Sequence, residues 1–177
     1  MPAADDLAIE VAVGREIHAV AAQLRAVDKT LPTKFRAAMR KTAATAIKRV
    51  KTAARTLPAA GRRGGTAAHP HKPRQLRRAV ARGVRAQAAT GGRRGAGLRI
   101  VTSMPLPAQA MLPRGLDTPG GWRHPVFGDR EDWVDQPGHS WFREPIAKEH
   151  PATKKAVLDL LAQARDQIAS AGASETT

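Results

Sequence analysis

The chain has 177 residues, no cysteine, and a formal charge of +15 from 30 Lys and Arg against 15 Asp and Glu. The absence of cysteine excludes disulfides, iron–sulfur clusters and zinc sites built on thiolates. No run of about 18 apolar residues occurs, which excludes a transmembrane helix. The first segment, with Asp5, Asp6 and Glu10, lacks the basic start of a secretory signal.

The positive charge is concentrated in one segment. Between Asp28 and Asp117 the chain has 21 basic residues and no acidic residue in 88 positions, whereas both ends are of mixed charge. A long segment of one sign repels itself and needs a counter-charge. We consider two sources of this counter-charge, nucleic acid and an acidic neighbouring protein. The alternative is a basic face that is exposed to solvent.

Periodicity predicts the elements of the N-terminal part. Leu7–Val13 alternates between apolar and other residues, which indicates a strand ending at Gly14, with an Ala-rich helix as the alternative. Apolar residues three and four apart predict a helix over Arg15–Val27.

A long amphipathic helix is expected next. Thr30 is placed to cap it, Pro32 fits its first turn, and the pattern continues to about Thr56. Lysines and arginines lie mostly off the apolar stripe. The stripe consists of Phe35, Met39, Ala43, Ile47, Val50, Ala54 and Leu57.

The middle of the chain has weaker patterns. Residues 58–73 and 90–97 are rich in Gly, Pro and Arg, and we predict mobile basic loops there. The secondary structure of residues 76–84 is ambiguous. The pattern of residues 97–103 predicts a strand, and that of residues 105–114 predicts one or two helical turns. No Gly-Lys pair occurs, so a nucleotide-hydrolysing P-loop is not expected.

The last helix is predicted to begin at Pro151 and to end at Gly172, with a disordered tail over 173–177. Together these elements indicate an α+β fold, with long amphipathic N-terminal helices, a small antiparallel sheet and a C-terminal helix. We expect one domain over residues 1–172.

Nearly all the aromatic residues lie in one short segment, in which they either seal the core or anchor a partner. The candidate residues for these two roles are Trp122, Arg123, His124, Pro125, Val126, Phe127, Gly128, Trp133, Gln136, Trp141 and Phe142.

This segment resembles a family of phage proteins. The motifs that carry the resemblance are R-H-P-V-F-G at 123–128, W-V at 133–134, Q-P-G at 136–138 and W-F at 141–142. They are similar to head–tail joining, neck or tail-completion proteins of long-tailed phages such as the actinobacteriophages. The order of parts is also similar: a basic helix pair, a Gly/Arg-rich loop, a strand, the aromatic motif and a C-terminal helix.

The resemblance implies a non-enzymatic virion protein between the head connector and the tail tube. It implies other neck and tail proteins as partners, a homo-oligomeric ring for which the family suggests six subunits, and assembly in the host cytoplasm. The tail terminator and the head-side stopper or adaptor of the same neck stay open as alternatives, and so does a small basic nucleic-acid-binding protein.

No catalytic, cofactor or metal site is predicted. The six histidines do not have the spacing of a closed zinc site, and no serine stands in G-x-S-x-G. In a neck, the basic segment would face double-stranded DNA and contact its phosphates without reading sequence. The candidates for this contact are Arg62, Arg63, Arg93 and Arg94, because neighbouring glycines let the backbone approach closely.

Overall fold

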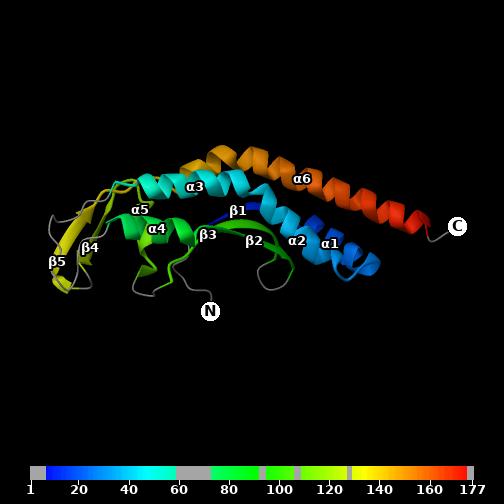
Figure 1. Ribbon diagram of the computed structural model, residues 1–177, viewed down its shortest axis with the longest axis horizontal. Coiled ribbons are helices and arrows are strands. Elements are labelled where there is room, and N and C mark those ends of the chain that lie inside the picture. Colours follow the sequence, from blue (N-terminus) through cyan, green and yellow to red (C-terminus); the bar gives the residue numbers. More distant parts are fainter. Residues whose placement is uncertain (1–6, 59–72, 92–94, 106–108, 127–128, 175–177) are drawn as a thin grey trace. The chain divides into compact units, whose positions relative to one another are not determined.

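The computed structural model describes residues 7–58, 73–91, 95–105, 109–126 and 129–174. They form an α+β protein with a long C-terminal helix, as the sequence predicts (Figure 1). None of the described helices is both long and apolar enough to cross a bilayer. The elements are, in chain order, β1 (Leu7–Val13), α1 (Arg15–Val27), α2 (Leu31–Thr42), α3 (Ala44–Thr56), α4 (Pro73–Gly83), β2 (Arg85–Thr90), β3 (Ala96–Thr102), α5 (Leu112–Leu116), β4 (Trp122–Val126), β5 (Asp129–Gln136) and α6 (Arg143–Ser174).

The chain divides into two compact units, each assembled from separate stretches of sequence. Unit 1 consists of Met1–Ala8, Lys48–Arg85 and Val101–Ala147, and unit 2 of Ile9–Ile47, Ala86–Ile100 and Lys148–Thr177. The single domain expected over residues 1–172 stays a prediction.

A three-stranded sheet has the strand order β1-β3-β2. The central strand β3 is buried at six of its seven positions, whereas no residue of the edge strand β2 is fully buried. Only five residues separate β2 from β3, a connection that suits antiparallel neighbours and is too short for a parallel crossover. Arg99 on β3 pairs with Glu10 on β1, 2.5 Å apart.

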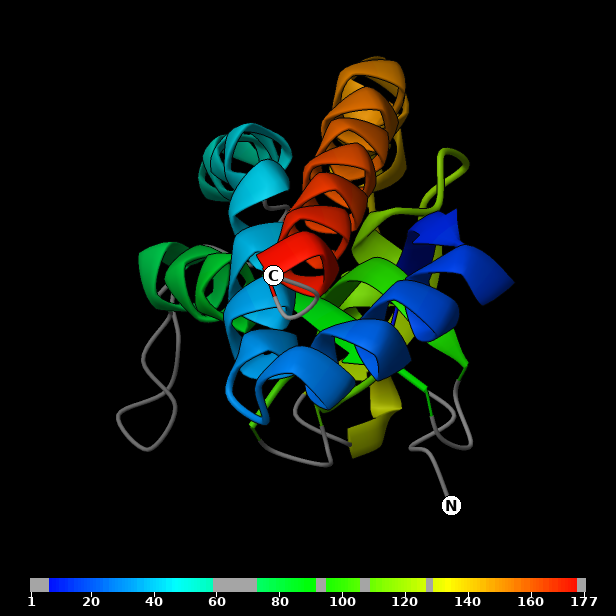
Figure 2. The ribbon, with the colours of Figure 1, turned by 90° about the vertical axis from the view of Figure 1, so that its right-hand side faces the viewer.

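The helices α1 and α2 pack against each other, with α1 in dark blue and α2 in light blue in Figure 2. In α1 the buried residues repeat three and four positions apart, as the sequence predicts: Ile17, Val20, Ala21 and Leu24. The N-terminus of α2 differs from the prediction, because the Thr30 hydroxyl caps no helical amide. It donates instead to the Asp28 carboxylate, which also accepts the Thr30 amide. This backbone hydrogen bond, more than the hydroxyl, lowers the pKa of Asp28.

The helix predicted from Thr30 to Thr56 is interrupted at Ala43. The Thr42 hydroxyl donates to the Met39 carbonyl at 2.8 Å, a bond that competes with the helical one. The Ala43 amide then donates to the carbonyls of Arg40 and Lys41, three and two residues back, in place of the Met39 carbonyl. The apolar stripe still continues through both helices, with Phe35, Met39, Ala43, Val50, Ala54 and Leu57 buried and Ile47 half-buried.

The last helix begins eight residues before Pro151, at Arg143, so the predicted start is wrong. A carboxylate that is distant in sequence accepts hydrogen bonds at the start of this helix. Asp117 Oδ1 accepts from the backbone amides of Phe142 at 2.8 Å and Arg143 at 3.3 Å. Gly172 does not stop the helix either, because α6 continues to Ser174.

The predicted loops fall largely outside the described residues. Residues 59–72 and 92–94 are not described, nor are 175–177 of the tail, so their mobility stays a prediction. The connection expected over 90–97 is shorter in the structure, because Thr90 ends β2 and Ala96 begins β3. The sequence missed β2, since its segment RAQAAT has no alternation of large apolar residues.

Candidate functional site

The end of the aromatic segment belongs to the core of unit 1. Trp141 and Phe142 are 2% and 0% exposed, and their rings meet edge to face with centroids 5.5 Å apart. The Trp141 indole donates to the Pro113 carbonyl at 3.3 Å. These two residues of the W-F motif therefore seal the core.

The middle of the segment forms an antiparallel hairpin of β4 and β5, in which Trp122 lies opposite Gln136 and Pro125 lies opposite Trp133. Trp122 stacks on His124 with centroids 4.5 Å apart. Its ring also occupies the space where a Cβ of Gly115 would stand, so α5 approaches this ring closely.

Trp133 is exposed, in contrast to Trp141. The residue is 45% exposed, and the Arg123 guanidinium lies 5.5 Å from its ring centroid. Arg123 pairs with Asp135 in the register, so Arg123 and Trp133 are diagonal neighbours across the hairpin. A basic and aromatic surface of this kind suits contact with another molecule.

The Q-P-G motif has a packing role. Gln136 is buried, and its amide Nε2 donates to the carbonyls of Pro58 at 3.4 Å and Pro137 at 3.3 Å. A Cβ at Gly138 would collide with the Thr118 carbonyl oxygen, so only glycine fits at this position. The side chain of Val126, with Phe127 and Gly128, lies outside the described residues.

Asp117 has a structural role that was not predicted from the sequence. It is fully buried, and besides the two amides at the start of α6 it contacts Arg143, whose Nε lies 3.1 Å from Oδ2. Burial raises the pKa of Asp117, against the hydrogen bonds from Phe142 and Arg143, which lower it. No local pattern could have found this role, because its partners lie 25 and 26 residues away.

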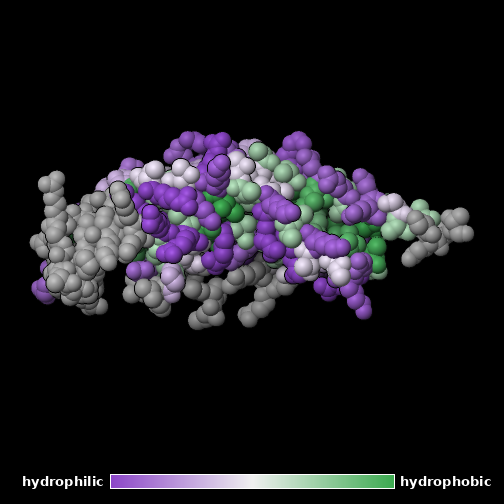
Figure 3. All heavy atoms as spheres, viewed as in Figure 1, coloured by the Kyte–Doolittle hydropathy of each residue, from purple (hydrophilic) through white to green (hydrophobic). Residues whose placement is uncertain are grey.

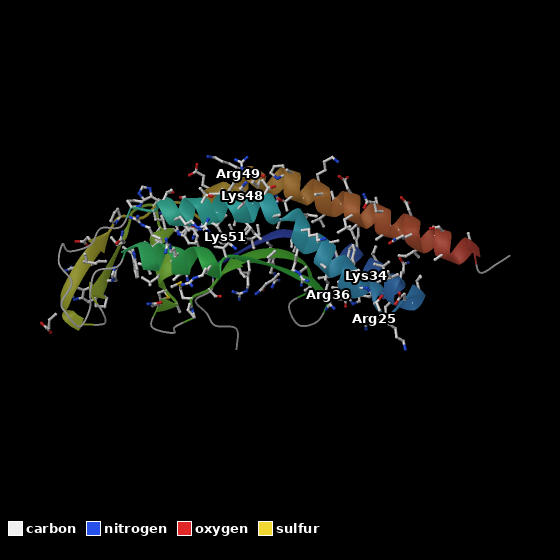
Figure 4. All side chains as sticks on the ribbon, in the orientation of Figure 1. Arg25, Lys34, Arg36, Lys48, Arg49 and Lys51 are labelled. Carbon is white, nitrogen blue, oxygen red and sulfur yellow. The ribbon has the colours of Figure 1, made fainter. Side chains whose placement is uncertain are left out.

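The described part of the acid-free segment carries most of its positive charge on exposed side chains of several elements. Figure 4 shows Lys48, Arg49 and Lys51 along α3, and Lys34 and Arg36 on α2. In Figure 3 hydrophilic residues cover much of the visible surface around these helices. The exposed bases are Lys29, Lys34, Arg40, Lys41, Lys48, Arg49, Arg55, Arg78, Arg82, Arg85 and Arg114.

The four arginines expected to face DNA, Arg62, Arg63, Arg93 and Arg94, lie outside the described residues. The structure therefore brings none of them to a described surface, and their role stays a prediction. Among the residues that the structure does describe, no group of three or more His, Asp or Glu side chains is arranged to hold a metal ion.

Comparisons with known proteins return no relative: no family model, no curated protein and no solved structure matches this chain significantly.

Proposed function

We propose that this chain is a non-catalytic structural protein of a phage neck, which joins the head connector to the tail and surrounds the DNA channel. The observation that carries the proposal is the acid-free segment, with 21 bases between Asp28 and Asp117, most of the described ones exposed. The resemblance of residues 122–142 to neck and tail-completion proteins supports the same function from a separate part of the chain. The protein acts in the virion, as an oligomeric ring with other neck and tail proteins.

Duplex DNA is a suitable counter-charge for this segment, because it carries one negative charge per about 1.7 Å of helix axis. Lys48, Lys51 and Arg55 follow one line along α3, three and four residues apart. Lys48 and Arg55 are exposed, and Lys51 is half-buried. Long basic side chains on one face of a helix contact phosphates and read no bases. This contact suits a channel through which DNA of any sequence passes.

The first prediction concerns DNA affinity. The α3 variant Lys48→Gln/Lys51→Gln/Arg55→Gln is expected to bind a short duplex more weakly, equally for two unrelated sequences. The plot of log affinity against log salt should become shallower: the magnitude of its negative slope should decrease by about 0.9 for each phosphate that the variant no longer neutralises. Fluorescence anisotropy over a salt series measures both quantities. Arg62→Ser/Arg63→Ser/Arg93→Ser/Arg94→Ser tests the loop candidates in the same assay.

A matched control removes the same charge from the part of the chain with mixed charges. Lys148→Gln/Lys154→Gln/Lys155→Gln on α6 also removes three positive charges, and we expect an unchanged salt slope for it. Equal weakening in both triple variants would mean that net charge alone binds DNA, and it would contradict a DNA-facing α3.

The place in the particle is tested with phage that carry the variants. If the acid-free segment faces the channel, heads and tails should join normally while DNA retention or ejection fails. Normal packaging, retention and ejection by both the α3 variant and the fourfold arginine variant would overturn the channel assignment. The basic segment would then contact an acidic surface of a neighbouring ring.

The alternatives differ in what they predict for purified particles. A tail terminator or head-side stopper would also stay with particles in high salt, and imaging of the labelled chain would place it above or below the tail-completion position. A small basic nucleic-acid-binding protein would instead wash off steeply as salt increases. Release from particles at high salt would therefore contradict the neck proposal.

A further inference from the structure

Unit 2 contains a hollow that the proposed function does not use. It is open to solvent and has a volume of about 440 Å³, within the range of about 300–1,000 Å³ usual for small-ligand sites. Three elements form it: α1, α2 and the end of β2 with the residue that follows. The lining residues are His18, Ala21, Ala22, Arg25, Arg36, Thr90 and Gly91.

The wall that α1 contributes follows from its helical spacing. His18, Ala22 and Arg25 are exposed and lie four and three residues apart, so they share one line of the helix. The small side chain of Ala22 leaves space between the imidazole and the guanidinium. This line borders the buried face of α1, which anchors the helix.

Arg36 reaches the hollow from α2, and Figure 4 shows it with Arg25, which approaches from α1. Its Nη2 donates to the Thr33 hydroxyl at 3.0 Å. This bond uses one of the five N–H donors of the guanidinium and orients the others. A guanidinium held in this way presents a planar fork that matches the oxygens of a phosphate.

The third wall contains a glycine. Gly91 has φ +150°, a backbone conformation that favours glycine, and a Cβ there would stand 2.7 Å from Cδ2 of the His18 ring. The His18 ring therefore lies close to the end of β2. Thr90 adds a hydroxyl group beside it.

The charged residues that line the hollow are all basic among those that the structure describes. Arg25 and Arg36 line it, and no described lining residue is an Asp or Glu. Like charges that share a hollow repel each other, and a bound anion relieves this repulsion. A planar carboxylate occupies one guanidinium fork, whereas the oxygens of a tetrahedral phosphate reach donors on several walls.

We propose that this hollow binds a phosphate group, held by Arg25 and Arg36 with His18 and Thr90 beside it. The group is either a phosphodiester of a nucleic-acid backbone or the phosphate of a free small molecule. The proposal does not depend on the neck function, because a hollow that binds a free phosphate compound needs no DNA channel.

Inorganic phosphate and a 12-base-pair DNA duplex serve as the two probes in calorimetric titrations of the full chain. Arg25→Gln and Arg36→Gln should each weaken phosphate binding at least tenfold. Arg40→Gln is the matched control, since Arg40 is exposed on the same helix as Arg36 and does not line the hollow. We expect its affinity to stay within twofold of the unchanged chain.

The variant Ala22→Leu distinguishes phosphate binding in a shaped site from binding to positive charge in general. It fills the space between His18 and Arg25 and keeps every charge, and Leu is a good helix former. Phosphate binding should be abolished, while circular dichroism and thermal unfolding without phosphate stay close to those of the unchanged chain. Retained phosphate binding in Ala22→Leu, or no phosphate binding by the unchanged chain, would overturn the proposal.

The duplex distinguishes the two sources of phosphate. If the same variants weaken duplex binding and reduce the magnitude of its negative salt slope by about 0.9 per phosphate, the group is a backbone phosphodiester. If only inorganic phosphate is affected, the hollow takes a free phosphate compound. Loss of DNA binding in the α3 triple variant, with phosphate binding unaltered in the hollow variants, would contradict this inference and leave the neck proposal standing.

Discussion

Replacing Trp141 by alanine should lower the free energy of unfolding by about 3–5 kcal/mol. The side chain is 2% exposed and packs edge to face on Phe142, so its removal leaves a cavity in the core of unit 1. It also removes the donor to the Pro113 carbonyl. Urea unfolding followed by the fluorescence of the other two tryptophans measures the change.

Trp133→Ala is the matched control, because it removes the same side chain from an exposed position. We expect a decrease of about 1 kcal/mol or less, the usual value of an exposed cation–π contact such as the one with Arg123. If Trp133 anchors a neck partner, this variant folds normally and fails to join heads to tails. Equal destabilisation by the two replacements would contradict the division of the aromatic segment into a buried and an exposed part.

Asp117→Ala should destabilise the fold by about 1–3 kcal/mol, the cost of leaving buried donors unpaired. The carboxylate accepts the amides of Phe142 and Arg143, and alanine offers neither amide a partner. Asp117→Asn keeps an oxygen for these amides and removes the charge. We therefore expect it to be more stable than Asp117→Ala in the same urea titration.

The stability of the unchanged chain and that of Asp117→Asn should also depend differently on pH. Burial raises the pKa of Asp117 in the folded chain above its ordinary value, so the folded state holds this proton more tightly than the unfolded state. The extra stability that comes from the tightly held proton of Asp117 is fully present below the ordinary pKa and is lost as pH rises through the raised pKa. Asparagine does not titrate. Between about pH 3 and pH 7 the stability of Asp117→Asn relative to the unchanged chain should increase, and a decrease would contradict this assignment.

Elements with a strong local period could be predicted from the sequence. The helix α1 has the predicted bounds, β1 and β3 lie where alternation places strands, and the buried stripe of α2 and α3 consists largely of the predicted residues. These predictions succeed because the side-chain pattern alone decides which face of a helix or strand is buried. The concentration of positive charge between Asp28 and Asp117 is likewise a property of the sequence.

The candidate sites were predicted less completely. The aromatic segment was identified, but its composition could not separate buried Trp141 from exposed Trp133, since each follows a polar residue and precedes an apolar one. The hollow of His18, Arg25 and Arg36 was not predicted. Its α1 residues have a readable spacing, but Gly91 and Arg36 come from other elements, and their approach depends on the packing of α1 on α2 and of β2 on β3.

The sequence by itself determined the class of fold, the amphipathic helices and the one-sided charge of the middle segment, because each depends on residues close together in the chain. The tertiary structure alone decided where α6 begins, since the carboxylate that holds its first amides is Asp117, 25 residues earlier. It also decided that RAQAAT is a strand, because β2 acquires its hydrogen bonds from β3 and not from its own pattern. Contacts between residues that are distant in sequence determine these features, and no local periodicity of side chains indicates them.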